Sequence, residues 1–189
     1  MARYPAEHKA RSTEALKSAA AQLFRSRGYA ATSIDDLCAA AGLTRGTFYA
    51  HFPSKQALFE AVMEGPHDFV ERLRARDDRA LLKGAAPIAR EYLNPAHRKA
   101  VLGGCSLASL AAETIRNGAP AQDAYARAVE ALIAEFRREQ PELDRERALA
   151  AAALAVGGLL MSGASGDNAL ANQLERAASR WVTQLLEGR

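Results

Sequence analysis

The chain has 189 residues, 49% of them hydrophobic and 25% charged, so it can bury a proper core and has an ordinary globular composition. The net charge is only +3, but residues 1–55 carry eight Lys/Arg against four Asp/Glu, whereas residues 56–189 carry 17 against 18. A small basic head on a neutral body favours contact with a polyanion. Chance clustering of surface charges is the alternative.

The N-terminus has no apolar signal segment. The longest apolar run, Ala148–Met161, falls short of the roughly 20 residues that span a bilayer. We therefore expect a buried helix, no membrane partner and a cytoplasmic protein. Cys38 and Cys105 lie far apart without a CxxC motif, which argues against a zinc site or a disulfide framework. The four histidines fit no catalytic or metal-binding motif, so we expect neither enzymatic activity nor a cofactor.

Residues typical of helix starts and helix ends recur along the chain, and alternating strand patterns are absent. This pattern predicts an all-α fold of nine or ten helices. The first helix should cover residues 9–27. Ser33 and Asp36 have the spacing of a capping box at the start of the second helix, over 34–41. Gly42 should end that helix, because glycine adopts the left-handed conformation at low cost.

Thr44 can cap a short third helix over residues 45–50, which Phe52-Pro53 should end. Ser54 can cap a fourth helix. Gly65-Pro66 interrupts that helix in the sequence, so we expect a kink or a break there.

Further along, a helix should begin near Gly84–Pro87, and Asn94-Pro95 forms a good helix start. A helix over residues 122–139 should end before Pro141, and Asp144 can cap the helix that contains the Ala/Gly run. The last helix shows one apolar stripe: Leu170, Leu174, Ala177, Ala178, Trp181 and Leu185.

The segment from Ser33 to Lys55 consists of a short helix, a glycine-containing turn and a second short helix. That is the helix-turn-helix plan, in which the second helix enters the major groove of DNA. Phe48 and Phe52 can anchor the second helix, while polar side chains face outward. The alternative is a small three-helix fold in which the N-cap residues only stabilise their helices and do not bind DNA.

Two stretches, Thr32–Asp36 and Ala41–Lys55, resemble the DNA-binding signature of the TetR family of bacterial regulators. The resemblance implies an N-terminal helix-turn-helix DNA-binding domain over residues 1–55 and a C-terminal helical ligand-binding and dimerisation domain over 56–189. It also implies a repressor that binds double-stranded operator DNA of palindromic sequence and is released by a small-molecule effector. The DNA-binding residues expected from it are Thr32, Ser33, Thr44, Arg45, Gly46, Thr47, Tyr49, His51 and Lys55.

The rest of the chain resembles the family more weakly. Small residues around Gly157-Gly158 let helices approach closely, so we expect a homodimer through the last two helices, with an intramolecular core helix as the alternative. The effector pocket should lie between the middle helices. Its candidate residues are Met63, His67, Phe69, Tyr92, Cys105, Ser109, Tyr125 and Met161, each of which can equally be core or surface.

Cys105 follows two glycines near an expected helix start, where the helix dipole lowers a thiol pKa. It is therefore a candidate sensor of electrophiles or oxidants, with a small buried apolar residue as the alternative. Cys38 is expected only to pack. The competing function for the whole chain is a helical adaptor or ligand-binding protein with a non-functional DNA-binding head.

Overall fold

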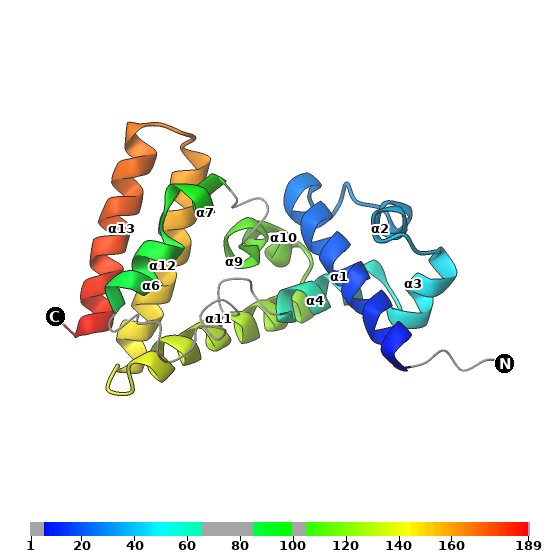
Figure 1. The fold of residues 1–189 in the computed structure, drawn as a ribbon, viewed down its shortest axis with the longest axis horizontal. Coiled ribbons are helices and arrows are strands. Elements are labelled where there is room, and N and C mark those ends of the chain that lie inside the picture. The colour runs from blue at the N-terminus through cyan, green and yellow to red at the C-terminus, as the bar shows by residue number, and fades with distance from the viewer. Residues whose placement is uncertain (1–5, 66–84, 100–104, 189) are drawn as a thin grey trace. The chain divides into compact units, whose positions relative to one another are not determined.

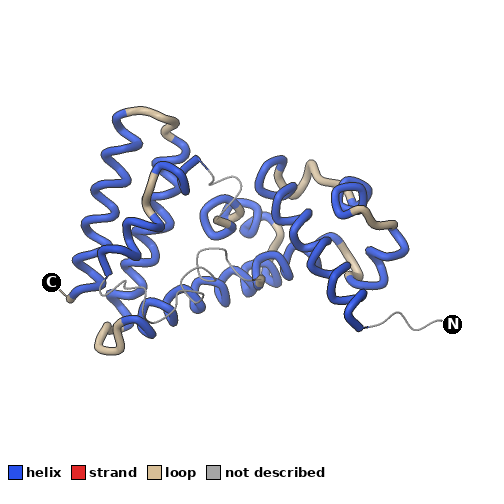
Figure 2. Tube along the Cα trace, in the orientation of Figure 1, coloured by secondary structure: helices blue, strands red, loops and turns tan. Residues whose placement is uncertain are grey.

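The computed structural model describes residues 6–65, 85–99 and 105–188. Throughout these ranges the regular structure is helical and contains no strand (Figure 2). The all-α fold class is therefore confirmed. Two of the candidate pocket residues, His67 and Phe69, lie outside the described residues.

The chain packs as two compact units, which we name the head unit and the body unit (Figure 1). The head unit comprises Met1–Gly65 and Leu110–Tyr125, and the body unit comprises residues 66–109 and 126–189. The head unit contains α1 (Ala6–Arg27), α2 (Ile34–Ala41), α3 (Arg45–His51), α4 (Lys55–Glu64) and α10 (Ala111–Arg116). The body unit contains α6 (Ala85–Tyr92), α7 (Pro95–Lys99), α9 (Ser106–Ser109), α12 (Arg145–Ala164) and α13 (Ala169–Glu187). Helix α11 (Ala119–Glu139) contributes its first turns to the head unit and the rest to the body unit.

The packing boundary differs from the functional boundary expected after residue 55. Helix α4 buries Leu58, Phe59 and Met63 in the head core, and residues 110–125 add apolar side chains to the same core. The separation of DNA-binding and ligand-binding functions at residue 55 stays a prediction.

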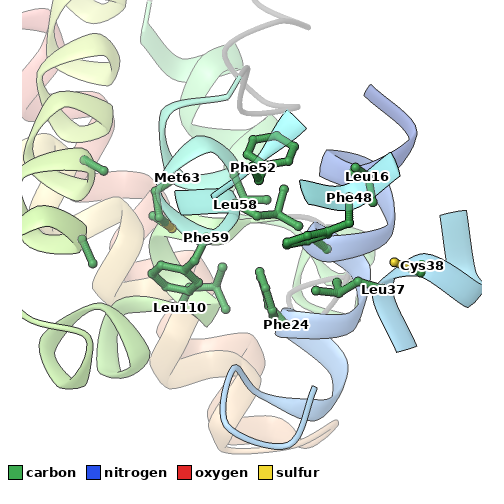
Figure 3. Close-up of a cluster of buried hydrophobic side chains, with 14 residues drawn as sticks. Leu16, Phe24, Leu37, Cys38, Phe48, Phe52, Leu58, Phe59, Met63 and Leu110 are labelled. Carbon is green, nitrogen blue, oxygen red and sulfur yellow. The ribbon is translucent and has the colours of Figure 1, made fainter. Parts of the chain in front are cut away.

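Aromatic side chains form the centre of the head core (Figure 3). The rings of Phe24 and Phe59 have centroids 5.6 Å apart, and Tyr29 packs edge-on to Phe59 at 5.2 Å. Phe48 and Leu110 are fully buried beside them. Each such side chain contributes about 1.5–3 kcal/mol of hydrophobic free energy, which fixes the short helices α2 and α3 on α1.

Local signals set the helix ends of the head unit, as predicted. Ser33 and Asp36 form the capping box of α2, and Gly42 ends this helix with a left-handed φ of 66°. The hydroxyl of Thr44 accepts the Thr47 amide at 3.2 Å, and that of Ser54 caps α4 in the same way.

The predicted interruption of the fourth helix is also confirmed on its described side. Helix α4 ends at Glu64, and Gly65 adopts an extended conformation with ψ of 164°. Helix α1 begins at Ala6, three residues before the predicted start.

Helices α12 and α13 lie side by side in the body unit, joined by a short turn (Figure 1). Gly158 permits their close approach, since a Cβ atom at this position would lie 2.6 Å from the Cβ of Ala178. Asp144 caps α12 by accepting the Arg147 amide at 2.9 Å, as predicted.

A buried ion-pair network attaches α7 to the start of α13. Arg98 is only 4% exposed and donates to Asp167 at 2.8 Å and to Asn172 at 3.0 Å. Its guanidinium also lies 3.2 Å from the buried carboxylate of Glu175. Burial raises the pKa of Glu175, and the charge of Arg98 opposes that shift. Removing Arg98 would leave the carboxylate of Glu175 buried and unpaired, so the network fixes the relative position of α7 and α13.

By length and apolar composition alone, α12 is the one described helix able to cross a membrane. One face of α12 packs against α13, α6, α7 and α9, and Ala148, Ala151, Ala155 and Leu159 are buried there. Packing within the body unit therefore accounts for the apolar residues on the buried face of this helix.

Candidate nucleic-acid interface

Helix α3 presents one buried and one exposed face. Phe48 is fully buried and Phe52 nearly so, which anchors the helix to the head core. On the other face the side chain of Arg45 is 59% exposed, and Tyr49 is 51% exposed. A short helix fixed by aromatic anchors and offering an arginine and a tyrosine to solvent suits contact with phosphates and base edges.

Arg45 is held in a defined position on this face. Its Nη1 lies 3.2 Å from a carboxylate oxygen of Asp35 on α2. A side-chain hydrogen bond with Tyr49 and the nearby Asp35 charge both raise the pKa of the guanidinium above its already high value. Arg45 therefore stays charged, and its exposed ion pair can open at little cost to meet another anion.

A cleft of about 710 Å³ separates the N-terminal part of α1 from α3 within the head unit. Thr44, Gly46, Thr47 and His51 from the expected DNA-binding set line this cleft. Lys9 and Ser12 of α1 line it as well. A lysine, a histidine and several hydroxyls around one concavity can bind a phosphate group through charge-assisted and neutral hydrogen bonds.

The orientation of His51 depends on α1. Its Nδ1 lies 3.0 Å from the hydroxyl of Thr13, and that hydroxyl donates to the carbonyl of Lys9 at 3.0 Å. The hydroxyl of Thr13 therefore bridges the Lys9 carbonyl and the His51 ring, which fixes the orientation of the imidazole. Lys9, Ser12 and Thr13 were not identified from the sequence, since no local pattern shows that α1 lies beside α3.

Lys55, one of the expected DNA-binding residues, points into the head unit. Its ammonium donates to the carbonyls of Tyr29 and Thr32, each at 2.8 Å, and lies 4.1 Å from the centroid of the Tyr29 ring. Burial lowers the pKa of this lysine. Two of the three N–H groups therefore stabilise the turn between α1 and α2, which leaves one for another acceptor.

The two residues before α2 have local roles. Thr32 is only 1% exposed, and its hydroxyl donates to the carbonyl of Gly28 at 2.8 Å. Ser33 is exposed, and its bonds with Asp36 lower the pKa of that carboxyl. Contact of Thr32 and Ser33 with DNA stays a prediction, and Ser33 is the one whose side chain reaches solvent.

The candidate effector residues do not form one group. Met63 is fully buried in the head core, and Tyr125 is half-buried against the same core. In the body unit, the Tyr92 hydroxyl lies 3.0 Å from the Sγ of Cys105, and Ser109 donates to the Cys105 carbonyl at 2.8 Å. Met161 is 56% exposed on α12.

Both cysteines are free and buried. Cys105 packs beside Tyr92, and the Tyr92 ring lies edge-on to His97 with centroids 4.9 Å apart. Burial raises the pKa of Cys38, which lies on the core face of α2 as expected. The sensing role of Cys105 stays a prediction. In the described part of the chain, no group of three His, Cys, Asp or Glu side chains could hold a metal ion.

The fold and this interface define a helical protein with an N-terminal helix-turn-helix head. Residues 16–62 match the model of the bacterial regulatory proteins of the tetR family. The chain is 32% identical over 87 residues to the HTH-type transcriptional repressor KstR2 of Rhodococcus jostii, covering 41% of each protein. It is 33% identical over 78 residues to the HTH-type transcriptional regulator EthR of Mycolicibacterium smegmatis, covering 37% of this chain and 36% of EthR.

The aligned parts thus span about two fifths of the length of these curated relatives. A TetR transcriptional regulator from Legionella pneumophila has a similar fold over nearly the whole chain, with 20% identity, a TM-score of 0.70 and coverage of 97% of this chain and 98% of that one. Residues 16–62 thus match the DNA-binding segment of the tetR family, and the described residues share the fold of this TetR regulator.

Proposed function

We propose that this protein is a sequence-specific DNA-binding transcriptional regulator, a cytoplasmic repressor that binds a palindromic operator as a homodimer. The exposed face of α3, with Arg45 and Tyr49 opposite the buried Phe48, carries the proposal. In a helix-turn-helix this face meets base edges in the major groove, and backbone contacts on either side fix its register.

The proposed DNA contacts fall into two groups. Arg45 and Tyr49 face the bases and the adjoining backbone. Thr44, Thr47 and His51 line the cleft beside Lys9, where they would bind a phosphate. Arg45 would bind a guanine through two parallel hydrogen bonds, the commonest specific contact in the major groove.

The dimer would form through α12 and α13. Leu149 and Leu160 on α12 are exposed and lie eleven residues apart, as are Leu170 and Trp181 on α13. Eleven residues make about three helical turns, so each pair lies on one side of its helix. Large exposed apolar side chains on adjacent helices are typical of a four-helix seam between two copies.

Release by a small-molecule effector is the proposed means of regulation. The described pocket candidates give no single cavity, so the proposal names no effector. Among them, Tyr92 and Cys105 make a contact between side chains in the interior of the body unit, with the hydroxyl oxygen and Sγ 3.0 Å apart.

The first experiment is a gel-shift titration on the intergenic DNA upstream of the protein's own gene, with random DNA as competitor. A competitor-resistant shift with the stoichiometry of a dimer would support a sequence-specific regulator. A Trp181→Glu variant should behave as a monomer in analytical ultracentrifugation and lose the shift.

A helical adaptor with a non-functional head would bind no DNA even at low salt, where phosphate contacts are strongest. Turnover in a substrate screen would instead favour an enzyme.

A further inference from the structure

A groove of about 600 Å³ lies in the body unit between α6 and α13, which pack side by side (Figure 1). Arg90 comes from α6, and Arg176 and Arg180 come from α13. Leu93 and Pro95 add an apolar part to the wall, and Thr183 adds a hydroxyl. None of these residues belongs to the DNA-binding set or to the candidate effector residues.

Among the described residues, no carboxylate pairs with the three arginines of the groove. Arg90, Arg176 and Arg180 form no ion pair with any residue that the structure describes. Glu175 is the one carboxylate among the described lining residues, and it is buried against Arg98. Three guanidinium groups around one concavity therefore attract anions.

The spacing of the arginines suits a ligand with more than one anionic group. Arg176 and Arg180 are one helical turn apart on α13, so they project from the same side of that helix. Arg90 faces the groove from α6. A guanidinium presents a planar fork of N–H donors that matches a carboxylate or a phosphate.

The wall that carries two of these arginines is rigid. Buried Arg98 connects α7 to Asp167 and Asn172 at the start of α13, and Asn172 also lines the groove. A site on a packed helix holds its charged groups in place before a ligand arrives, which lowers the entropic cost of binding.

The groove lies on a different side of α13 from the apolar seam. Arg176 precedes Trp181 by five positions, so the two side chains project about 140° apart around the helix axis. A dimer built on Leu170 and Trp181 would leave the arginine side of α13 open.

We propose that this groove binds a small organic anion with at least two negatively charged groups, carboxylate or phosphate, and an apolar part that rests on Leu93 and Pro95. This site is additional to operator binding and does not depend on it. A negative result in the DNA-binding experiments would therefore not contradict anion binding in the groove. Absence of anion binding would likewise not contradict the DNA-binding proposal.

Isothermal titration calorimetry on the full chain tests the site, with pyrophosphate and citrate as separate probes at constant ionic strength. We expect saturable binding of at least one probe, with one molecule per chain. The probe that binds identifies the anionic group. The double variant Arg176→Gln/Arg180→Gln should weaken binding at least tenfold, and Arg90→Gln should weaken it on its own.

The matched control is Arg116→Gln/Arg127→Gln, which removes the same charge from exposed positions outside the groove. Its affinity for the probe should stay within twofold of the parent. Circular dichroism verifies that all variants fold. Absence of saturable binding of both probes, an equal loss in the control, or undiminished binding by the Arg176/Arg180 variant would each overturn the proposal.

Discussion

The hydroxyl of Thr13 on α1 fixes the imidazole of His51 on α3, with Oγ1 and Nδ1 3.0 Å apart. This contact sets the direction in which Nε2 points. A half-buried residue of the first helix thereby positions a side chain of the proposed recognition helix.

Thr13→Val should weaken operator binding about fivefold, on the order of 1 kcal/mol for one hydrogen bond, with little change in thermal stability. Fluorescence anisotropy with labelled operator measures the loss. Thr13→Ser should restore binding, because it keeps the hydroxyl. Ser26→Ala is the control, since Ser26 also donates to a carbonyl within α1. Unchanged affinity in Thr13→Val would show that the orientation of His51 is irrelevant to DNA binding.

Arg45→Ala should reduce operator affinity by about 1–3 kcal/mol and relax sequence preference. The reason is that Arg45 is exposed on the face opposite Phe48 and stays charged at any accessible pH. Titrations on operator and on random DNA measure both effects, with Arg116→Ala as the control in the head unit. Equal losses of affinity for operator and for random DNA would show that Arg45 contacts only phosphate.

Lys55→Met should lower the free energy of unfolding by about 1.5–3 kcal/mol, the range for hydrogen bonds to a charged group. The ammonium would no longer join the carbonyls of Tyr29 and Thr32. Urea denaturation measures this loss. If Lys55 also contacts a phosphate, the slope of log affinity against log salt should flatten by about one. A stable variant with only a flatter slope would contradict the structural role.

Gly158→Ala should destabilise the body unit by about 1–3 kcal/mol, since its Cβ would overlap Ala178. Gly157→Ala is the matched control, because nothing lies within 4 Å of a Cβ there. Replacing a mid-helix glycine by alanine adds helix propensity of up to ~1 kcal/mol. Denaturant unfolding compares the pair, and equal stability of the two variants would rule out the close approach at Gly158.

The features that the sequence predicted correctly depend on interactions between residues close together in the chain. Ser33, Thr44, Ser54 and Asp144 cap their helices as expected, because an N-cap acts on amides two or three residues away. The outward face of α3 followed from the burial of Phe48 next to it. Both were accessible from spacing alone.

Features that depend on tertiary packing were missed. The sequence around Thr13 gives no sign of a special role, because that role depends on the packing of α1 beside α3. The inward turn of Lys55 depends on two carbonyls more than twenty residues away. The arginine groove joins α6 to α13 across about ninety residues of sequence, so no window of the chain reveals it.

The participation of residues 110–125 in the head core has a consequence for synthesis on the ribosome. Leu110, Ala121 and Ala124 are fully buried in the cluster that holds Phe24 and Phe59, and Gln56 donates to the carbonyl of Asn117 at 3.2 Å. A nascent chain that has exposed only α1–α4 still lacks part of its own interior. The helix-turn-helix would therefore acquire full protease resistance only after α10 and the start of α11 leave the exit tunnel, and a gene fragment cut after residue 65 would encode an incomplete fold.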